Sequence, residues 1–214
     1  MVKMKYYHKI ENIFNRNMDG SKKLIIGDFR NETVKFLKDA EWICTEKIDG
    51  TNIGVVWDGH KVSYIGRTER SDIPKKLIAS LDAQFQGNEV ETIFEQLFGE
   101  KQAILFGEGF GGRIQKGSHY SEDEDFILFD VYFPESDVYA KREFVSGVAY
   151  ALNIKIVPIV FRGGLMGAVN YVVQKPLSAF SNNVMEGVVA RPLVELKDNQ
   201  GKRIIVKIKV QDYV

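Results

Sequence analysis

Three observations predict an α+β fold for this chain. Short segments of β-prone, apolar residues recur along it, and each has the length of a strand. Between them lie segments in which apolar residues recur at helical spacing, such as Leu77, Leu81 and Phe85. Asp58-Gly59 is a turn signal that joins two strands as an antiparallel hairpin. Because no interior linker divides the 214 residues, we expect one domain over residues 1–214.

The elements follow in order from these patterns. A short helix is expected at 31–38, and strands at 42–46 and 52–57 enclose a loop that contains a lysine. The Asp58-Gly59 turn returns the chain as a strand at 61–66. A helix begins after residues 71–74, and a second one at 88–98 is stopped by Gly99. The remaining expected elements are strands at 102–107, 126–133, 154–160, 186–191 and 203–210, and a helix at 141–152.

Composition excludes several classes of protein. Hydrophobic residues make up 44% of the chain and aromatic residues 12%, which is ample for a packed core. No apolar run approaches the length that spans a membrane, and the single cysteine, Cys44, points to a reducing, cytoplasmic setting. Lys plus Arg and Asp plus Glu both number 29, so the chain lacks the basic excess that nucleic-acid-binding proteins usually carry.

The most informative segment is Lys47-Ile-Asp-Gly-Thr51, which lies between two predicted strands. A lysine in such a strand-loop-strand can point into a cleft, and Gly50 would let backbone approach a ligand closely. Taken alone, so short a pattern occurs often by chance and favours an ordinary surface turn.

Further segments in a fixed order change that interpretation. Together they resemble the covalent nucleotidyltransferase superfamily of DNA ligases, RNA ligases and capping enzymes, and above all the phage RNA ligase 2 family. The matching segments are Glu46-Lys47-x-x-Gly50-Thr51-Asn52, Phe106-Gly107-Glu108, Gly112-x-Ile114-Gln115-Lys116, Phe129-Asp130, Glu186-Gly187 and Lys207-x-Lys209. The resemblance implies an adenylation domain with two antiparallel-rich sheets flanked by helices and a nucleotide cleft between them.

The resemblance assigns roles around the lysine. Lys47 would be the nucleophile that takes up a nucleotide, and Glu46 would contact that nucleotide. Asp49 would orient Lys47 or a metal-bound water, although Asp before Gly also suits a turn. Asn52 would contact a phosphate or a metal-bound water, with a loop-capping role as the alternative.

Three more residues would bind the nucleotide by resemblance. Arg67 would reach the ribose or a substrate phosphate, and Glu108 would accept a hydrogen bond from a ribose hydroxyl. Phe129 would stack on the purine, whereas its strand pattern alone indicates a core residue. Gly107 and Gly112 delimit a G-x-G-x-x-G segment, but no helical period follows it, which argues against a dinucleotide fold. We therefore expect these glycines to serve tight turns.

The last motifs carry the acid and the two further lysines. Glu186 would hold a divalent metal, Mg²⁺ or Mn²⁺, which needs few protein carboxylates when phosphate is present. Lys207 and Lys209 alternate with apolar residues, so both lie on one face of a strand. Two like charges side by side would repel unless an anion lies between them, and a triphosphate supplies that anion.

We therefore expect an ATP-dependent RNA ligase that forms a lysyl-AMP, transfers AMP to a 5′-phosphate end and seals that end with a 3′-hydroxyl. Its partners would be ATP and RNA ends or nicked duplex, with no membrane. The chain stops five residues after Lys209, so we expect no C-terminal domain, with a partner protein as its possible replacement. A DNA ligase core and a nucleotide-binding module without turnover stay open, as does the choice between ATP and GTP.

Overall fold

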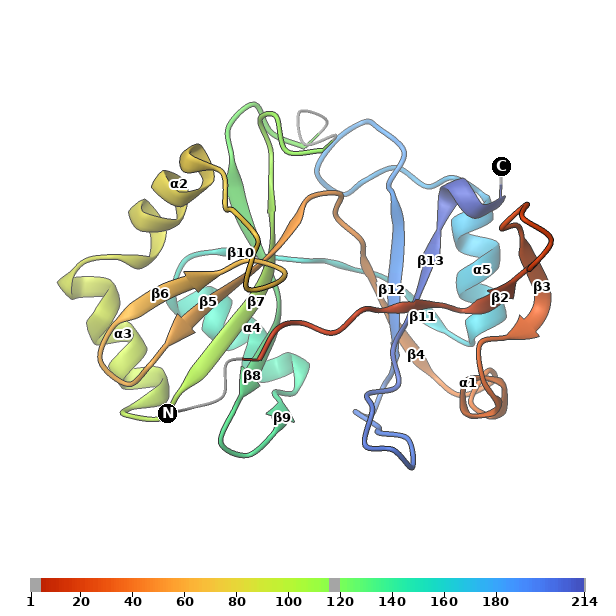
Figure 1. Ribbon diagram of the computed structural model, residues 1–214, viewed down its shortest axis with the longest axis horizontal. Coiled ribbons are helices and arrows are strands. Elements are labelled where there is room, and N and C mark those ends of the chain that lie inside the picture. The colour runs from red at the N-terminus through yellow and green to blue at the C-terminus, as the bar shows by residue number, and fades with distance from the viewer. Residues whose placement is uncertain (1–4, 116–119, 214) are drawn as a thin grey trace. The chain divides into compact units, whose positions relative to one another are not determined.

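The computed structural model describes residues 5–115 and 120–213 (Figure 1). The chain divides into two compact units, each built from segments far apart in the sequence. Unit 1 contains the N-terminal segment up to His8 together with Asp49–Val157. Unit 2 contains Lys9–Ile48 together with the chain from Pro158 onward. The boundary between Ile48 and Asp49 falls within the Lys47–Thr51 motif, so Lys47 belongs to unit 2 and Asp49 to unit 1.

Unit 1 is built on one largely antiparallel sheet with the strand order β10-β8-β7-β5-β6, and β9 pairs with β8. Only β10 runs parallel to its neighbour, β8. The strands are β5 (Thr51–Trp57), β6 (Val62–Ile65), β7 (Ala103–Phe110), β8 (Asp125–Phe133), β9 (Val138–Tyr139) and β10 (Lys155–Ile156).

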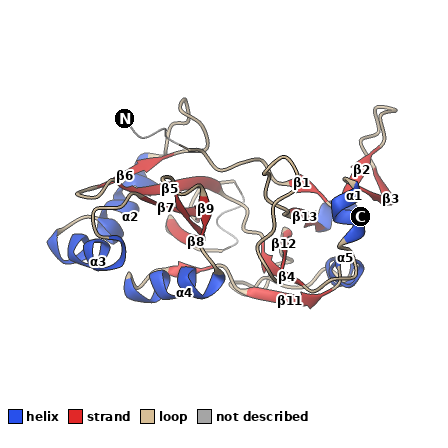
Figure 2. Cartoon of the chain, turned by 90° about the horizontal axis from the view of Figure 1, so that it is seen from below, coloured by secondary structure: helices blue, strands red, loops and turns tan. Residues whose placement is uncertain are grey.

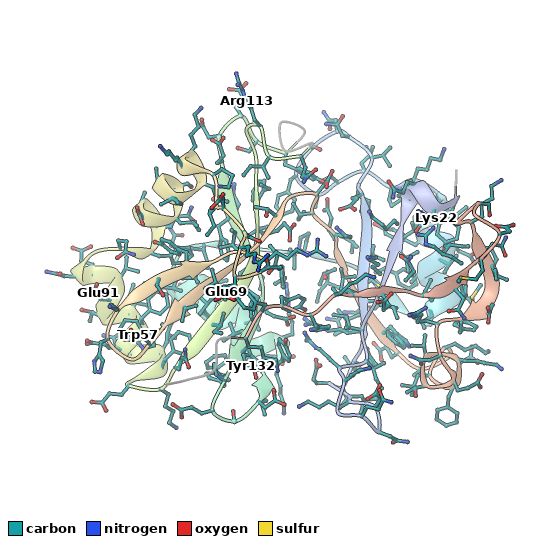
Figure 3. The ribbon with its side chains drawn as sticks, in the orientation of Figure 1. Lys22, Trp57, Glu69, Glu91, Arg113 and Tyr132 are labelled. Atoms are coloured by element: carbon teal, nitrogen blue, oxygen red, sulfur yellow. The ribbon has the colours of Figure 1, made fainter. Side chains whose placement is uncertain are left out.

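Helices cover one face of this sheet (Figure 2). They are α2 (Lys75–Phe85), α3 (Asn88–Phe98) and α4 (Arg142–Ala151). Their apolar residues pack with those of β5, β7 and β8 in a single core. Trp57, labelled in Figure 3, is fully buried there, and its ring stacks on Phe94 with the ring centroids 5.4 Å apart. Helix α3 has the predicted bounds because Gly99 adopts a left-handed φ of 59° and ends it.

The opposite face of the sheet is rich in aromatic residues, and we call it the aromatic face. Its members are Val56, Ile104, Phe106, Tyr132 and Tyr139, with Tyr7, Ile65 and Phe129 packed against them. A β-bulge interrupts the pairing of β7 with β8, since Phe106 faces Asp130 while Gly107 faces Leu128. Phe129 is thus the extra residue, and a bulge of this kind redirects a side chain.

Unit 2 contains a five-stranded sheet with the order β1-β13-β12-β4-β11 and a two-stranded sheet, β2-β3. Helix α5 packs on one face of the larger sheet (Figure 2). Its elements are β1 (Glu11–Asn12), β2 (Phe14–Arg16), β3 (Leu24–Phe29), α1 (Glu32–Phe36), β4 (Trp42–Glu46), β11 (Ile159–Gly163), α5 (Leu165–Val173), β12 (Gly187–Pro192), β13 (Val206–Lys209) and the 3-10 helix η2 (Val210–Tyr213).

Packing fixes which side chains of this sheet face which way. Cys44, Val188, Ala190, Val206 and Ile208 lie in the core beneath α5. Because side chains alternate along a strand, Lys207 and Lys209 lie on the other face, which we call the lysine face.

The α+β prediction is confirmed, and most predicted elements are present with shifted ends. The strand predicted at 154–160 is wrong as one element. It is two strands, β10 in the sheet of unit 1 and β11 in that of unit 2, separated by Val157-Pro158. Proline cannot donate to a ladder, which favours a break there. Helix α5 was not predicted, nor were β1 to β3.

The predicted role of the motif glycines is only partly confirmed. Gly111 and Gly112 have φ values of 89° and 51°, as turns require. Gly107 and Gly109 instead lie within β7. A Cβ on Gly107 would lie 2.3 Å from the ring of Phe126, so core packing selects glycine there. Among the described residues, no helix has the length and apolar character needed to cross a membrane.

Candidate active site

The lysine motif follows the end of β4 in unit 2. The Lys47 backbone N–H donates to the carbonyl of Gly187 at 2.9 Å, which continues the pairing of β4 with β12 by one residue. The Lys47 Nζ lies 2.5 Å from Glu186 Oε2, and the Lys209 Nζ lies 2.7 Å from Glu186 Oε1. One carboxylate therefore bridges two ammonium groups, and all three side chains are mostly buried.

Gly187 makes this arrangement possible. Its φ is 152°, and a Cβ there would lie 2.1 Å from the carbonyl oxygen of Ile208. Only glycine lets β13 approach this closely. The pairing sets Gly187 opposite Lys209 and so brings the Lys209 side chain to Glu186.

Lys207 lies two residues before Lys209 on the same face. Burial lowers the pKa of its ammonium group, and the nearby charges of Lys209 and Lys47 lower it further. Glu11 acts in the opposite direction. The cost of holding these cations together indicates that the lysine face is arranged for an anion.

Two arginines extend the same face. Ile43 pairs with Arg191 of β12 on one side and with Arg162 of β11 on the other. Alternation along β12 puts Arg191 on the face opposite Val188 and Ala190, which is the lysine face. Neither arginine was predicted from the sequence, because strand order alone brings them into one row.

Glu46 is predicted to contact the nucleotide, but its side chain is not among those gathered around Glu186. It alternates with Lys47 and shares the α5 side of the sheet with Cys44. Its Oε2 accepts a hydrogen bond from the Ala179 backbone N–H at 2.9 Å. Burial is the main cause of the raised pKa of Tyr171 on α5, and the negative charge of Glu46 raises it further. The carboxylate thus fastens the loop between α5 and β12 to the end of β4.

In unit 1, three predicted residues share the aromatic face. Asn52 of β5 pairs directly with Glu108 of β7, so their Cβ atoms are about 5 Å apart on one side of the sheet. The Asn52 Oδ1 is buried and accepts no hydrogen bond from the described residues. Phe129 projects from the bulge on the same face and is only partly buried. This face therefore offers an aromatic surface beside polar groups.

Three further residues of the predicted motifs, Asp49, Gly50 and Arg67, also lie in unit 1. The Asp49 N–H lies 3.4 Å from the Tyr120 hydroxyl, within unit 1. A Cβ on Gly50 would lie 2.3 Å from the carbonyl oxygen of Gly109, so the approach of β7 requires glycine there. Arg67 is exposed beyond the end of β6. The predicted motif residue Lys116 lies outside the described residues.

Tyr7, which was not predicted from the sequence, also lies on the aromatic face. Its hydroxyl donates to Asp130 Oδ2 at 2.6 Å, and its ring contacts Phe129 edge-on with the centroids 4.9 Å apart. The available signal was a short alternation in which Lys5 and Tyr7 point the same way. Two residues of alternation are too few to predict a strand.

A metal ion would find few protein ligands. Within the described parts of the chain, no group of three or more His, Cys, Asp or Glu side chains could hold one. Glu186 supplies a carboxylate on the lysine face. This donor set fits Mg²⁺ or Mn²⁺ bound mainly by water and phosphate, and it does not fit a cage made of protein ligands.

Solved structures of a Naegleria gruberi RNA ligase are similar to this chain. The ligase with PPi is 21% identical, with a TM-score of 0.65 over 85% of this chain and 53% of that one. A mutant with ATP and Mn is 20% identical, with a TM-score of 0.65 over 85% and 52% of the two chains. A mutant with AMP and Mn is 20% identical, with a TM-score of 0.64 over 85% and 53%. The chain thus spans about half the length of these ligases, and likeness at this identity establishes a shared fold.

No curated protein sequence matches the chain. The family model described as RNA ligase matches residues 40–209. That span includes β4, β5 and the bulge at Phe129. It also includes the ion pairs of Lys47 and Lys209 with Glu186. Because the match covers most of the chain, this protein belongs to the RNA ligase family.

Proposed function

We propose that this protein is an ATP-dependent RNA ligase that works through a covalent lysyl-AMP on Lys47. The observation that carries the proposal is the pair of Lys47 and Lys209 on the Glu186 carboxylate, with Lys207 on the same sheet face. Family membership and the ATP and AMP in the similar Naegleria structures support the choice of chemistry and of nucleotide.

In the first step, the unprotonated Nζ of Lys47 attacks the α-phosphorus of ATP. A nitrogen–phosphorus bond forms, the bond from that phosphorus to the β-phosphate oxygen breaks, and pyrophosphate leaves with the electron pair. The Nζ must part from Glu186 to come within about 3–3.5 Å of phosphorus. Lys207 and Lys209 would stabilise the charge that grows on the leaving pyrophosphate.

A divalent metal would be held by Glu186, with phosphate and water as its other ligands. It would supply charge neutralisation and Lewis acidity at the phosphate. Glu186 would then contact the metal in place of the two lysines, and Lys47 and Lys209 would contact phosphate oxygens.

Two further transfers complete the proposed reaction. A 5′-phosphate oxygen of RNA attacks the AMP phosphorus, which breaks the bond to Lys47 and forms a phosphoanhydride. A 3′-hydroxyl then attacks the activated 5′-phosphate, a phosphodiester forms, and AMP leaves. Arg162 and Arg67 are exposed, and we expect them to contact the polynucleotide phosphates. We propose that both units act together as one catalytic domain, because the motifs are divided between them.

The test is incubation with ATP labelled at the α-phosphate and a magnesium salt, followed by a denaturing gel and intact mass. We expect a mass increase of one AMP on the wild-type protein and none on Lys47→Ala. Lys35→Ala is the matched control, since it removes a lysine from the exposed part of unit 2 on α1. Labelling of Lys47→Ala at the wild-type rate would refute the assignment.

Joining assays then test the substrate. RNA-containing and all-DNA nicks are compared in the same buffer, at low and moderate salt. We expect a preference for RNA ends and a steep fall in joining with salt, because the binding rests on phosphate contacts. Equal sealing of all-DNA nicks would favour a DNA ligase instead. Self-adenylylation without joining would point to a partner protein that supplies polynucleotide binding.

A further inference from the structure

We propose that Tyr7 is a positioning residue for Phe129, so that the N-terminal segment helps to prepare the surface on which the purine stacks. This inference rests on the proposed nucleotide chemistry. Tyr7 lies outside the span matched by the family model, and it belongs to unit 1 together with the strand that carries Phe129.

The segment from Lys5 to His8 is fastened to the aromatic face at two points. The Lys5 Nζ lies 2.8 Å from the Tyr132 hydroxyl and 2.5 Å from Asp137 Oδ1, and it sits 4.1 Å from the centre of the Tyr132 ring. Tyr132 is labelled in Figure 3. Two residues further on, the Tyr7 hydroxyl donates to Asp130 at 2.6 Å. Because Lys5 and Tyr7 both contact β8 or its hairpin, this segment acts as a strap across the sheet.

The Tyr7 anchor is strong because its acceptor is buried. Asp130 is only 2% exposed. A hydroxyl that donates to a carboxylate at this distance makes a charge-assisted hydrogen bond, which is stronger than a neutral one. It fixes the position and tilt of the Tyr7 ring.

The fixed ring in turn contacts Phe129. Tyr7 meets both Phe106 and Phe129 edge-on, with centroid distances of 5.0 and 4.9 Å. Phe129 is the extra residue of the bulge, and it has fewer cross-strand neighbours to fix its side chain than a regular strand residue. Since Asp130 is the next residue, one tyrosine holds the bulge through its hydroxyl and the aromatic side chain through its ring.

The experiment measures non-covalent binding to the Lys47→Ala protein, so that no lysyl-AMP forms. Calorimetry gives the dissociation constants of ATP and of inorganic tripolyphosphate, which has no base. We expect Tyr7→Ala to weaken ATP binding about three- to tenfold. Tripolyphosphate binding should change less than about twofold. Tyr6→Ala is the matched control, because it removes the same side chain from the adjacent position, and it should leave both constants unchanged.

A double-variant cycle separates positioning from direct contact. If Tyr7 acts through Phe129, Tyr7→Ala should have no further effect on ATP binding in a Phe129→Ala background. Additive losses would overturn the proposal, as would equal losses for ATP and tripolyphosphate. If circular dichroism shows that Tyr7→Ala is unfolded, Tyr7→Leu replaces it in the same cycle.

The two proposals fail in different ways. ATP binding with the expected coupling, but no covalent label on the wild-type protein, would refute lysyl-AMP formation and leave the role of Tyr7 intact. Labelling of Lys47 with no coupling between Tyr7 and Phe129 would do the reverse. No ATP binding by Lys47→Ala protein with an intact Tyr7 would overturn the role of Tyr7.

Discussion

The lysine face of unit 2 and the aromatic face of unit 1 are both sheet surfaces, yet they differ in the side chains that they present. On the lysine face, Lys47 and Lys209 both contact the Glu186 carboxylate, and Lys207 lies on the same face. It holds cations at an energetic cost that an anion would relieve. The aromatic face holds packed rings beside two polar groups, Asn52 and Glu108. Charge therefore dominates one surface, and packing dominates the other.

The largest effect should come from the lysine face. Lys209→Ala removes a cation that lies 2.7 Å from Glu186 and that we expect to face the leaving pyrophosphate. We expect the rate of adenylylation to fall about 100- to 1,000-fold, as when a preorganised charge-stabilising donor is lost. Single-turnover labelling at saturating ATP measures this rate. A fall below about threefold would mean that Lys209 merely neutralises Glu186.

A smaller and more selective effect should follow from a change on the aromatic face. Phe129→Ala should raise the dissociation constant of ATP about tenfold or more, because the base loses its stacking partner. Tripolyphosphate binding should not change. Phe36→Ala, which truncates an 86% exposed phenylalanine on α1, is the control. Equal weakening of both ligands by Phe129→Ala would remove the distinction between the two faces.

The smallest effect concerns stability. Burial and the neighbouring Lys209 and Lys47 lower the pKa of Lys207, so its charge destabilises the folded state at neutral pH. Lys207→Met should raise the melting temperature by about 1–2 °C at pH 7. In the wild-type protein, the free energy of unfolding should rise as the pH increases from the lowered pKa towards about 10.4, because the unfolded chain then binds more protons.

The advantage of Lys207→Met should accordingly shrink near pH 10, where the wild-type side chain has lost its charge. Thermal melts at the two pH values measure this, with Lys35→Met as the exposed control. An advantage that is absent at pH 7, or that grows with pH, would show that the lysine face carries no such cost.

Local patterns were sufficient where the structure depends on neighbouring residues. The alternation of Lys207 and Lys209 predicted their shared face, and the residues around Asp58-Gly59 and Gly99 predicted a hairpin and a helix end. Sheet order is different, because it depends on pairing between distant segments. The order of neighbouring strands places Arg162 and Arg191 in one row. It also determines that Glu46 lies on the α5 side of the sheet.

The same limit applies to Tyr7 and to the bulge. A bulge adds one residue to a strand without changing its composition, so β8 reads as an ordinary apolar strand. The pairing of Tyr7 with Asp130 joins residues 123 positions apart. Elements therefore follow from the sequence more readily than the contacts that orient the residues of the site.

The strand order of unit 2 has a consequence for synthesis on the ribosome. Among the described strands, β4 pairs only with β11 and β12. This apolar segment therefore leaves the ribosome roughly 110 residues before its first partner, or about 6–20 s earlier at typical elongation rates. Most of unit 1 is the continuous stretch Asp49–Val157, which is complete before β11 emerges. We expect unit 1 to fold first, while β4 is still unpaired and prone to aggregation.

Cys44 lies within β4, where burial raises the pKa of its thiol to about 12 in the folded protein. The loss of Cys44 alkylation in stalled nascent chains of increasing length would therefore show at which chain length β4 pairs with its neighbours.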